Sequence, residues 1–331
     1  MKKYVVAVAG ATGLVGRKML QVLEEHRFPV SEIRPLASAR SAGKTVTFAG
    51  KHEPVRELTL DSFDGVEIAL FSAGATVSRE YAPHAVRAGT LVVDNSSAFR
   101  LDPGVPLVVP EVNRADIFRN RGIIANPNCS TIQMVVALKP LHDLWGIRRI
   151  VVSTYQSVTG AGKKGLNQLE DEIAQRLAGE KKFPHQIAFN VLPQVDVFLD
   201  DGSSKEEYKM VEETKKIMGD DTIRVTATCV RVPVWGGHSE SVNVEFEKPC
   251  DVAAARAALA AAPGVIVRDD PGRSEYPMPV DVWDTDPVYV GRIRRDPTLR
   301  SGLNLWIVAD NLRKGAATNA VQIAEEWIKG Q

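Results

Sequence analysis

The sequence predicts an α/β protein with a Rossmann-type nucleotide-binding domain and a second, α+β domain with a mixed sheet. Before Cys129, short apolar strands alternate with helical segments, which is typical of a parallel sheet with right-handed crossovers. After Cys129, longer strands of alternating character predominate, which indicates an antiparallel or mixed sheet with one covered face. We therefore expect a first domain over residues 1–128, completed by a C-terminal helix over residues 313–331, and a second domain over residues 129–312.

The composition excludes several classes of protein. The chain has 331 residues, of which 44% are hydrophobic and 25% charged, as in ordinary globular proteins. Lys plus Arg and Asp plus Glu both number 41, which gives no electrostatic reason to expect a nucleic-acid or membrane partner. Cys129, Cys229 and Cys250 are too few and too far apart for a disulfide framework or a metal site. With no signal peptide or membrane-spanning run, we expect a cytoplasmic protein without a metal.

In the first domain, short apolar runs predict strands and apolar residues at helical spacing predict helices. The strands are expected at residues 4–9, 33–38, 67–72, 91–94 and 107–109, and the helices at residues 17–25 and 79–88.

The second domain shows longer alternating runs, interrupted by helical segments. Strands are expected at residues 149–156, 222–233, 241–247, 288–294 and 303–309. Helices are expected at residues 165–178, 205–218 and 253–262, with a terminal helix at residues 313–329.

The turn from Gly10 to Gly16 stands between the first strand and the first helix. In that context, glycines let backbone N–H groups approach a pyrophosphate at a helix N-terminus. The spacing is G-x-x-G-x-x-G, with Gly10, Gly13 and Gly16, and not the standard G-x-G-x-x-G. The strand and helix on either side, more than the glycines, predict a dinucleotide site.

The end of the second strand favours NADP over NAD. An NAD site usually has an acidic residue there for the ribose 2′-hydroxyl, whereas this strand is followed by Arg40 and Ser41. An arginine and a hydroxyl suit a 2′-phosphate, although a solvated loop arginine is the alternative. Ser72 follows a later strand, where small residues let a cofactor lie close; an ordinary tight turn would look the same.

Cys129 stands in Asn126-Pro127-Asn128-Cys129-Ser130-Thr131, directly before a run of apolar residues at helical spacing. We expect the helix to begin between Asn128 and Ser130, which places Cys129 in its first turn. Unpaired N–H groups and the helix dipole stabilise a thiolate there, so Cys129 is a candidate nucleophile. The alternative is a small buried apolar residue.

Several polar residues could serve such a nucleophile. His238 follows two glycines and has the right chemistry for acid–base work, and Arg231 ends a strand and could clamp a carboxylate. Gln156 could hydrogen-bond an acyl intermediate, and Arg100 could form an anion pocket. A structural histidine and a salt-bridged arginine are the alternatives. Glu206 and Lys209 share a helix face; without other evidence, they read as an exposed ion pair.

Taken together, these motifs resemble the aspartate-semialdehyde dehydrogenase family over nearly the whole chain. The segments that carry the resemblance are residues 10–16, 94–100, 126–131, 156–162, 231–240 and 310–316, in that order. The resemblance implies a nucleotide-binding domain and a catalytic and dimerisation domain, a homodimer, and NADP as cofactor.

The resemblance also implies roles for individual residues. Cys129 would be the thioester nucleophile, His238 the general acid–base and Gln156 the group that orients the intermediate. Arg231 would bind the substrate carboxylate and Glu206 its amino group, while Arg100 and Lys209 would bind phosphate, with Asn128 also at the substrate. The expected NADP contacts are Gly10, Thr12, Gly13, Leu14, Val15, Arg40, Ser41, Ser72, Thr159, Gly160 and Asn311.

The reaction implied is NADPH-dependent conversion of L-4-aspartyl phosphate to L-aspartate 4-semialdehyde and phosphate, which feeds lysine, methionine, threonine and isoleucine synthesis. Two alternatives stay open. An N-acetylglutamyl-phosphate reductase uses related chemistry, but that family resembles Pro-Gly-Cys-Tyr where this chain has Pro127-Asn128-Cys129-Ser130. A non-enzymatic NADP-binding redox sensor could use Cys129 as a switch.

Overall fold

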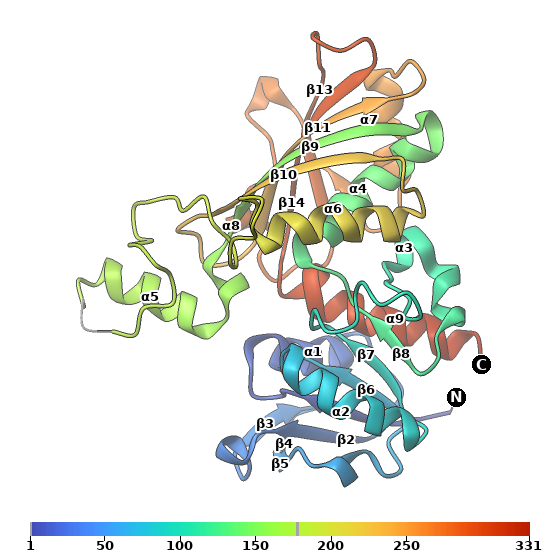
Figure 1. The fold of residues 1–331 in the computed structure, drawn as a ribbon, viewed down its shortest axis with the longest axis vertical. Helices are drawn as coiled ribbons and strands as arrows, with labels where there is room; N and C mark the ends of the chain where they lie inside the picture. The colour runs from blue at the N-terminus through green and yellow to red at the C-terminus, as the bar shows by residue number, and fades with distance from the viewer. Residues whose placement is uncertain (1, 177–178) are drawn as a thin grey trace. The chain divides into compact units, whose positions relative to one another are not determined.

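The computed structural model describes residues 2–176 and 179–331 and divides into two compact units (Figure 1). One unit comprises Met1–Asn128 and Ala316–Gln331, and the other comprises Cys129–Gly315. The C-terminal segment thus belongs to the same unit as the N-terminal part of the chain. In the described part of the chain, no helix combines the length and the apolar character that a membrane crossing requires.

The first unit is built on a parallel sheet with the strand order β5-β2-β1-β6-β7-β8. Its strands are β1 (Tyr4–Ala9), β2 (Val30–Ala37), β5 (Arg56–Glu57), β6 (Ile68–Phe71), β7 (Leu91–Asp94) and β8 (Ile123–Ala125). A separate hairpin is formed by β3 (Thr45–Phe48) and β4 (Lys51–Pro54). The parallel sheet confirms the nucleotide-binding half of the fold prediction.

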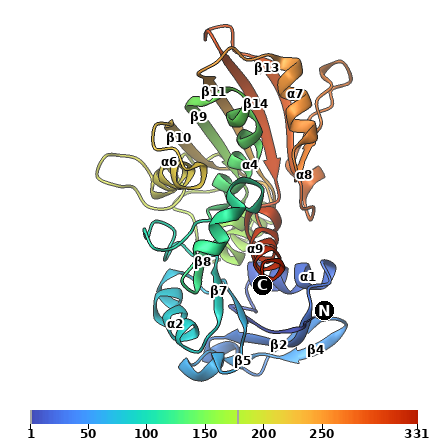
Figure 2. The ribbon, with the colours of Figure 1, turned by 90° about the vertical axis from the view of Figure 1, so that its right-hand side faces the viewer.

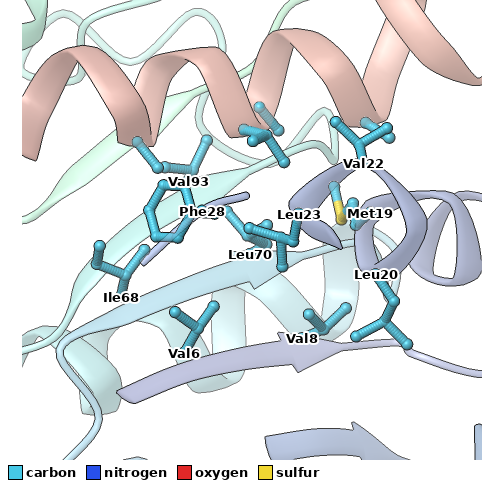
Figure 3. Close-up of a cluster of buried hydrophobic side chains, with 14 of the residues drawn as sticks. Val6, Val8, Met19, Leu20, Val22, Leu23, Phe28, Ile68, Leu70 and Val93 are labelled. Atoms are coloured by element: carbon cyan, nitrogen blue, oxygen red, sulfur yellow. The ribbon is translucent and has the colours of Figure 1, made fainter. Parts of the chain in front are cut away.

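Both faces of this sheet are covered by helices, which explains why its central strands β1, β6 and β7 are almost entirely apolar. Along β1, Val6 and Val8 belong to one hydrophobic core, whereas Ala7 and Ala9 belong to another on the opposite face. The first core includes residues of α1 (Leu14–Glu25) and α9 (Thr318–Lys329), and Figure 3 shows its labelled side chains between the strands and these helices. The second core includes residues of α2 (Ala75–Arg87).

One expected strand of the first unit was wrong. Residues 107–109 form no strand; Leu107 makes a single parallel bridge to Ala125, and the sheet continues through β8 instead. Pro106 and Pro110 flank this segment. Proline has no backbone N–H to donate to a neighbouring strand, and its ring fixes the φ angle. The short helix α3 (Pro110–Asn113) begins directly after it.

The second unit is built on a mixed sheet with the order β10-β9-β11-β14-β13-β12, as the alternating runs predicted. Its strands are β9 (Ile147–Gln156), β10 (Arg224–Arg231), β11 (His238–Phe246), β12 (Val265–Val267), β13 (Val288–Arg295) and β14 (Gly302–Ala309). The strand β9 pairs parallel with β10 and antiparallel with β11, which in turn pairs antiparallel with β14. One face is covered by α4 (Cys129–Trp145), α6 (Lys205–Met218) and α7 (Val252–Ala261), with α4 in the middle (Figure 2).

Two other helices belong to this unit, α5 (Lys163–Ile173) and α8 (Pro279–Val282). The helix expected at residues 165–178 ends earlier, at Ile173, and positions 177 and 178 lie outside the described residues.

The terminal helix expected at residues 313–329 begins differently from the prediction. Residues Arg313–Ala317 form a π-helical turn, and α9 follows. Asp310 causes the wider turn: its carbonyl oxygen accepts the N–H of Gly315, five residues on, at 3.0 Å. Its carboxylate accepts the N–H of Leu312 at 2.7 Å and that of Arg313 at 3.0 Å.

Candidate active site

Cys129 is the first residue of α4, as the helical spacing predicted, and it is half-buried. The first turn of this helix contains no acidic residue, so nothing there opposes a negative sulfur. Gly315 lies beside it: a Cβ atom on Gly315 would stand only 2.8 Å from the Cβ of Cys129. The chain can therefore pass this close to the cysteine only with glycine at position 315.

His238 begins β11 and is fully buried. Its Nδ1 accepts the backbone N–H of Ser157 at 3.1 Å, so the neutral ring has its proton on Nε2. Among the described residues, Nε2 has no hydrogen-bond partner. Burial, reinforced by the positive charge of Arg231, lowers the pKa of His238 to about 3, although Glu206 opposes the shift. The resting ring is therefore neutral, with an N–H available for a ligand.

Arg231, the last residue of β10, is buried beside the same loop. Its Nη1 donates to the carbonyl oxygen of Ser157 at 2.7 Å, whereas Nε has no partner among the described residues. Burial lowers the pKa of Arg231, while the negative charges of Glu206 and Cys129 favour its charged form. Cys129 and Arg231 thus lie within electrostatic range of each other.

Gly160 marks the point at which these groups meet. A Cβ atom on Gly160 would lie 2.6 Å from Nη1 of Arg231 and 3.1 Å from Nε2 of His238. A side chain at this position would collide with both groups, so the chain can lie this close to them only with glycine at position 160.

A network of hydrogen-bonded side chains connects the loops around His238. Oδ1 of Asn311 accepts the N–H of Gly237 at 3.0 Å and the hydroxyl of Ser157, also at 3.0 Å. Thr159 joins through a hydrogen bond of 3.2 Å from the Asn311 amide. Asn311 and Thr159, expected as cofactor contacts, therefore also connect the loops around His238. Sequence reasoning missed Ser157, whose only local signal is its place directly after Gln156.

Gln156, Glu206 and Lys209 form a second connected group. Nε2 of Gln156 donates to Glu206 at 3.2 Å, and Lys209 forms ion pairs with Glu206 at 3.1 Å and with Asp196 at 2.9 Å. Burial would lower the pKa of Lys209, but these two carboxylates raise it. The ion pair of Glu206 and Lys209 is thus largely buried, whereas the sequence alone indicated an exposed pair. Asp196 was missed because it lies in a loop without a recognisable motif.

The start of α6 is joined to β10 by one carboxylate. Ser204 and Glu207 form a capping box, in which Glu207 accepts the N–H of Ser204 at 2.6 Å. The other oxygen of Glu207 accepts the backbone N–H of Cys229 at 2.9 Å. Because Glu206 and Arg231 are close neighbours of these two residues in sequence, this bridge sets their relative position.

Cys229 and Cys250 differ from Cys129 in their surroundings. Cys229 is fully buried, with its sulfur 3.8 Å from the sulfur of Met210, and burial raises its pKa. Cys250 is half-buried after the end of β11, where its backbone N–H donates to Ser301. Neither residue begins a helix.

Arg100 belongs to the first unit and is held by backbone oxygens. Its Nε donates to the carbonyl of Asn126 and its Nη2 to that of Asn95, both at 2.9 Å. Asp94 accepts hydrogen bonds from Ser78 and Ser96, and burial raises its pKa. Asn128, buried, is the last residue of this unit before α4.

The expected cofactor loop has the geometry of a phosphate cradle. Gly10 has φ +86°, and a Cβ atom there would stand 2.4 Å from the carbonyl oxygen of Ser72. A Cβ atom on Gly16 would lie 2.2 Å from the carbonyl oxygen of Gly10, so only glycine permits the tight passage into α1. Gly13 caps α1 without a side-chain hydrogen bond, which leaves the first N–H groups for a ligand. The residues present therefore fit a dinucleotide.

The other expected cofactor residues of the first unit lie around this loop. Thr12 belongs to the glycine turn, and Leu14 and Val15 form the start of α1. Arg40 is exposed on a 3₁₀ turn after β2, and Ser41 in the same turn is buried.

Comparison with known proteins identifies the class. Residues 5–119 match the NAD binding domain of semialdehyde dehydrogenases, and residues 138–314 match their dimerisation domain. With the parallel sheet, the glycine loop and the cysteine at a helix start, the chain is an NAD(P)-binding semialdehyde dehydrogenase with a dimerisation domain.

Individual relatives narrow the assignment. The chain is 57% identical to the aspartate-semialdehyde dehydrogenase of Aquifex aeolicus, over 98% of each chain. It is 51% identical to a solved aspartate semialdehyde dehydrogenase II of Vibrio cholerae, complexed with ASA, with a TM-score of 0.95 over 99% of each chain. A structure of the Candida albicans enzyme with NADP is 26% identical, with a TM-score of 0.78 over 98% of each chain.

The chain belongs to the aspartate-semialdehyde dehydrogenase family. It is an enzyme with that activity, in the aspartate pathway of amino-acid biosynthesis, and not the reductase or redox sensor that the motifs left open.

The low pKa of His238 predicts a pH dependence of stability. An unfolded histidine binds a proton below about pH 6.5, whereas His238 in the folded chain stays neutral down to about pH 3. Folding therefore becomes less favourable as the pH falls through this window. The variant His238→Asn keeps an acceptor for Ser157. As the pH falls from 6 to 5, its free energy of unfolding should rise by about 1 kcal/mol relative to that of the unmodified protein.

Urea unfolding at each pH measures this difference. His52→Asn, which removes a histidine from the exposed strand β4, is the matched control. A difference between the His238→Asn and unmodified proteins that does not change with pH would contradict the low pKa of His238.

Proposed function

We propose that this chain reduces L-4-aspartyl phosphate to L-aspartate 4-semialdehyde with NADPH, through a thioester on Cys129. The reverse reaction is a phosphate-dependent oxidation of the aldehyde. The observation that supports this most is the convergence of chemically distinct groups in one unit. A cysteine begins a helix, its negative charge favours the charged form of Arg231, and Nη1 of Arg231 and the unpartnered Nε2 of His238 both lie against Gly160.

Cys129 performs the covalent step. Its thiolate attacks the acyl carbon, a C–S bond forms, and the bond from carbon to the phosphate oxygen breaks as inorganic phosphate leaves. Bound NADPH supplies the hydride that reduces the acyl group. As the aldehyde carbonyl re-forms, the C–S bond breaks and its electron pair returns to sulfur, which restores the thiolate of Cys129.

His238 serves the oxygen of the reacting carbonyl. That oxygen gains negative charge when sulfur adds to the carbon, and the Nε2–H group of His238 is oriented to donate to it. As general acid, His238 gives its Nε2 proton to this oxygen as the negative charge develops, and as general base the ring takes the proton back when the carbonyl re-forms, which is the general acid–base role that we assign to His238. Gln156, held by Glu206, orients the intermediate.

We assign substrate recognition to two charged groups. Arg231 binds the substrate carboxylate, a role supported by its buried guanidinium with an unpartnered Nε. Glu206 binds the amino group. Arg100 and Lys209 bind phosphate, and Asn128 assists at the substrate. For Lys209, this role requires phosphate to compete with Asp196 and Glu206, its present partners.

We assign NADP to the first unit. The loop with Gly10, Thr12, Gly13, Leu14 and Val15 receives the pyrophosphate, and Ser72 lines it closely. The exposed Arg40 and the neighbouring Ser41 receive the 2′-phosphate. Thr159, Gly160 and Asn311 complete the proposed set of NADP contacts.

We also propose that residues 1–128 with 313–331 form the NADP-binding domain, and residues 129–312 the catalytic and dimerisation domain of a cytoplasmic homodimer. The homodimer is supported by an exposed ring on the other face of the mixed sheet: Tyr155 is exposed there, and its ring lies 5.5 Å from that of Trp306. The cytoplasm is supported by three cysteines without disulfides.

Cys129 is predicted to be the only cysteine that turnover requires. Cys129→Ala should lower kcat by about 10³-fold or more, because no other group can form the thioester. Cys229→Ala and Cys250→Ala serve as matched controls and should keep most activity. The assay is phosphate-dependent reduction of NADP with the aldehyde, and an active Cys129→Ala enzyme would overturn the mechanism.

Arg40 is predicted to select NADP over NAD. Arg40→Ala should raise the KM for NADP about tenfold or more and leave the KM for NAD almost unchanged, because only NADP carries the 2′-phosphate. The control is Arg56→Ala, an exposed arginine on the edge strand β5, which should change neither constant. Equal losses with both cofactors would mean that Arg40 supports the loop and does not bind phosphate.

Arg231 and Arg100 are predicted to bind different parts of the substrates. Arg231→Lys should raise the KM for the aldehyde, because lysine cannot reproduce the planar fork, and should leave the KM for phosphate unchanged. Arg100→Ala should chiefly raise the KM for phosphate. Truncating one partner of a buried charged pair costs about 2–5 kcal/mol of binding free energy. Such a loss would change the KM for the aldehyde or the KM for phosphate by a large factor. The division of roles fails if both variants alter both constants alike.

A further inference from the structure

The two carbonyl oxygens that hold Arg100 come from two asparagines at the same edge of the parallel sheet. Asn95 directly follows β7 and Asn126 directly follows β8, and the last residues of these paired strands, Asp94 and Ala125, lie opposite each other. Nε of Arg100 donates to the carbonyl oxygen of Asn126 and Nη2 to that of Asn95, each at 2.9 Å. The orientation of this buried guanidinium therefore depends on the relative position of the two segments.

The side chains of the same two asparagines are hydrogen-bonded to each other and to a third asparagine. Nδ2 of Asn126 donates to Oδ1 of Asn95 at 2.7 Å, and Oδ1 of Asn126 accepts from Nδ2 of Asn319, also at 2.7 Å. Asn319 lies on α9, which packs against β6 and β7 in the same unit, and both Asn319 and Asn126 are fully buried. Asn95, Asn126 and Asn319 thus form an asparagine cluster behind Arg100.

Backbone carbonyl oxygens fix the direction of these hydrogen bonds. The amide nitrogen of Asn319 also donates to the carbonyl oxygen of Val108 at 2.9 Å, and that of Asn126 donates to the carbonyl oxygen of Ala316 at 3.2 Å. Because a carbonyl oxygen can only accept, each amide nitrogen must face its carbonyl, which leaves Oδ1 of Asn126 as the acceptor for Asn319. The amide of Asn319 thus holds two oxygens at once, and a carboxyl group in its place could donate to at most one of them.

We propose that Asn319 is a positioning residue for phosphate binding: through Asn126, it fixes the backbone carbonyl oxygens that orient Arg100. Without the amide of Asn319, the side chain of Asn126 can shift, and the carbonyl oxygen that accepts from Nε of Arg100 shifts with it. Charge-assisted hydrogen bonds from arginine to phosphate depend on the direction of the planar guanidinium, so a small rotation weakens them. The inference rests on the proposed role of Arg100 in binding phosphate.

The experiment measures the KM for phosphate of Asn319→Ala during oxidation of the aldehyde. This KM should rise about fivefold or more, whereas the KM values for the aldehyde and NADP should stay within about twofold, because Asn319 acts on the group that binds phosphate. A smaller rise in the KM for phosphate, or an equal rise in all three constants, would overturn the proposal. If Asn319→Ala does not fold, Asn319→Asp decides in its place, since it keeps the shape of asparagine and can donate to at most one of the two oxygens.

A matched control separates positioning from general support of the fold. Val321→Ala, on the same helix, removes two methyl groups from the first hydrophobic core and should lower the melting temperature. Val321 is not a member of the asparagine cluster, so the KM for phosphate of this variant should stay unchanged. If Val321→Ala raises this KM as much as Asn319→Ala does, Asn319 only stabilises α9 and the proposal is wrong.

The double variant Arg100→Ala/Asn319→Ala tests whether Asn319 acts through Arg100. If it does, the KM for phosphate of the double variant should equal that of Arg100→Ala within about twofold, and effects that multiply would contradict the proposal. Arg100→Ala alone separates the two hypotheses. An unchanged KM for phosphate in Arg100→Ala means that the proposed function of Arg100 fails, whereas a raised KM in Arg100→Ala with an unchanged KM in Asn319→Ala refutes only the role of Asn319.

Discussion

The backbone of Ser157 is the constraint on which the site depends. Its N–H donates to Nδ1 of His238, and its carbonyl oxygen accepts from Arg231. The first hydrogen bond assigns the ring proton to Nε2, and the second orients the guanidinium. One residue directly after β9 thus orients groups from β10 and β11, and a side chain at position 160 would collide with both groups.

Burial decides which groups near this site are charged. Lys209 and Glu206 remain an ion pair because each has an oppositely charged partner within hydrogen-bond distance. His238 and Glu240 have no such partner, so burial favours their neutral forms. A neutral imidazole with a free N–H stabilises a developing oxyanion without adding a second positive charge beside Arg231. The distribution of charge therefore suits addition of a thiolate to a carbonyl group.

Sequence patterns anticipated the sheets, the long helices and the helix start at Cys129, because apolar periodicity and turn residues are local signals. They failed where contacts or flanking residues that apolar periodicity does not report decide the outcome. Residues 107–109 are apolar, yet two flanking prolines and the nearby β8 prevent a strand. The π-helical turn depends on Asp310, whose single carboxylate rearranges the start of the terminal helix. Ser157, Gln133 and Asp196 have no motif that marks them.

By itself, the sequence determined the two-part α/β organisation, the family resemblance and the residues able to do the chemistry, since these follow from residue type and local spacing. Only the tertiary structure decided that Lys209 is paired with Asp196, that His238 carries its proton on Nε2, and that Gln133 donates to the carbonyl oxygen of His238. Each of these depends on strands or helices remote in sequence. Hydrogen-bond partners and loss of solvent set a side chain's charge and tautomer, and only the folded chain supplies both.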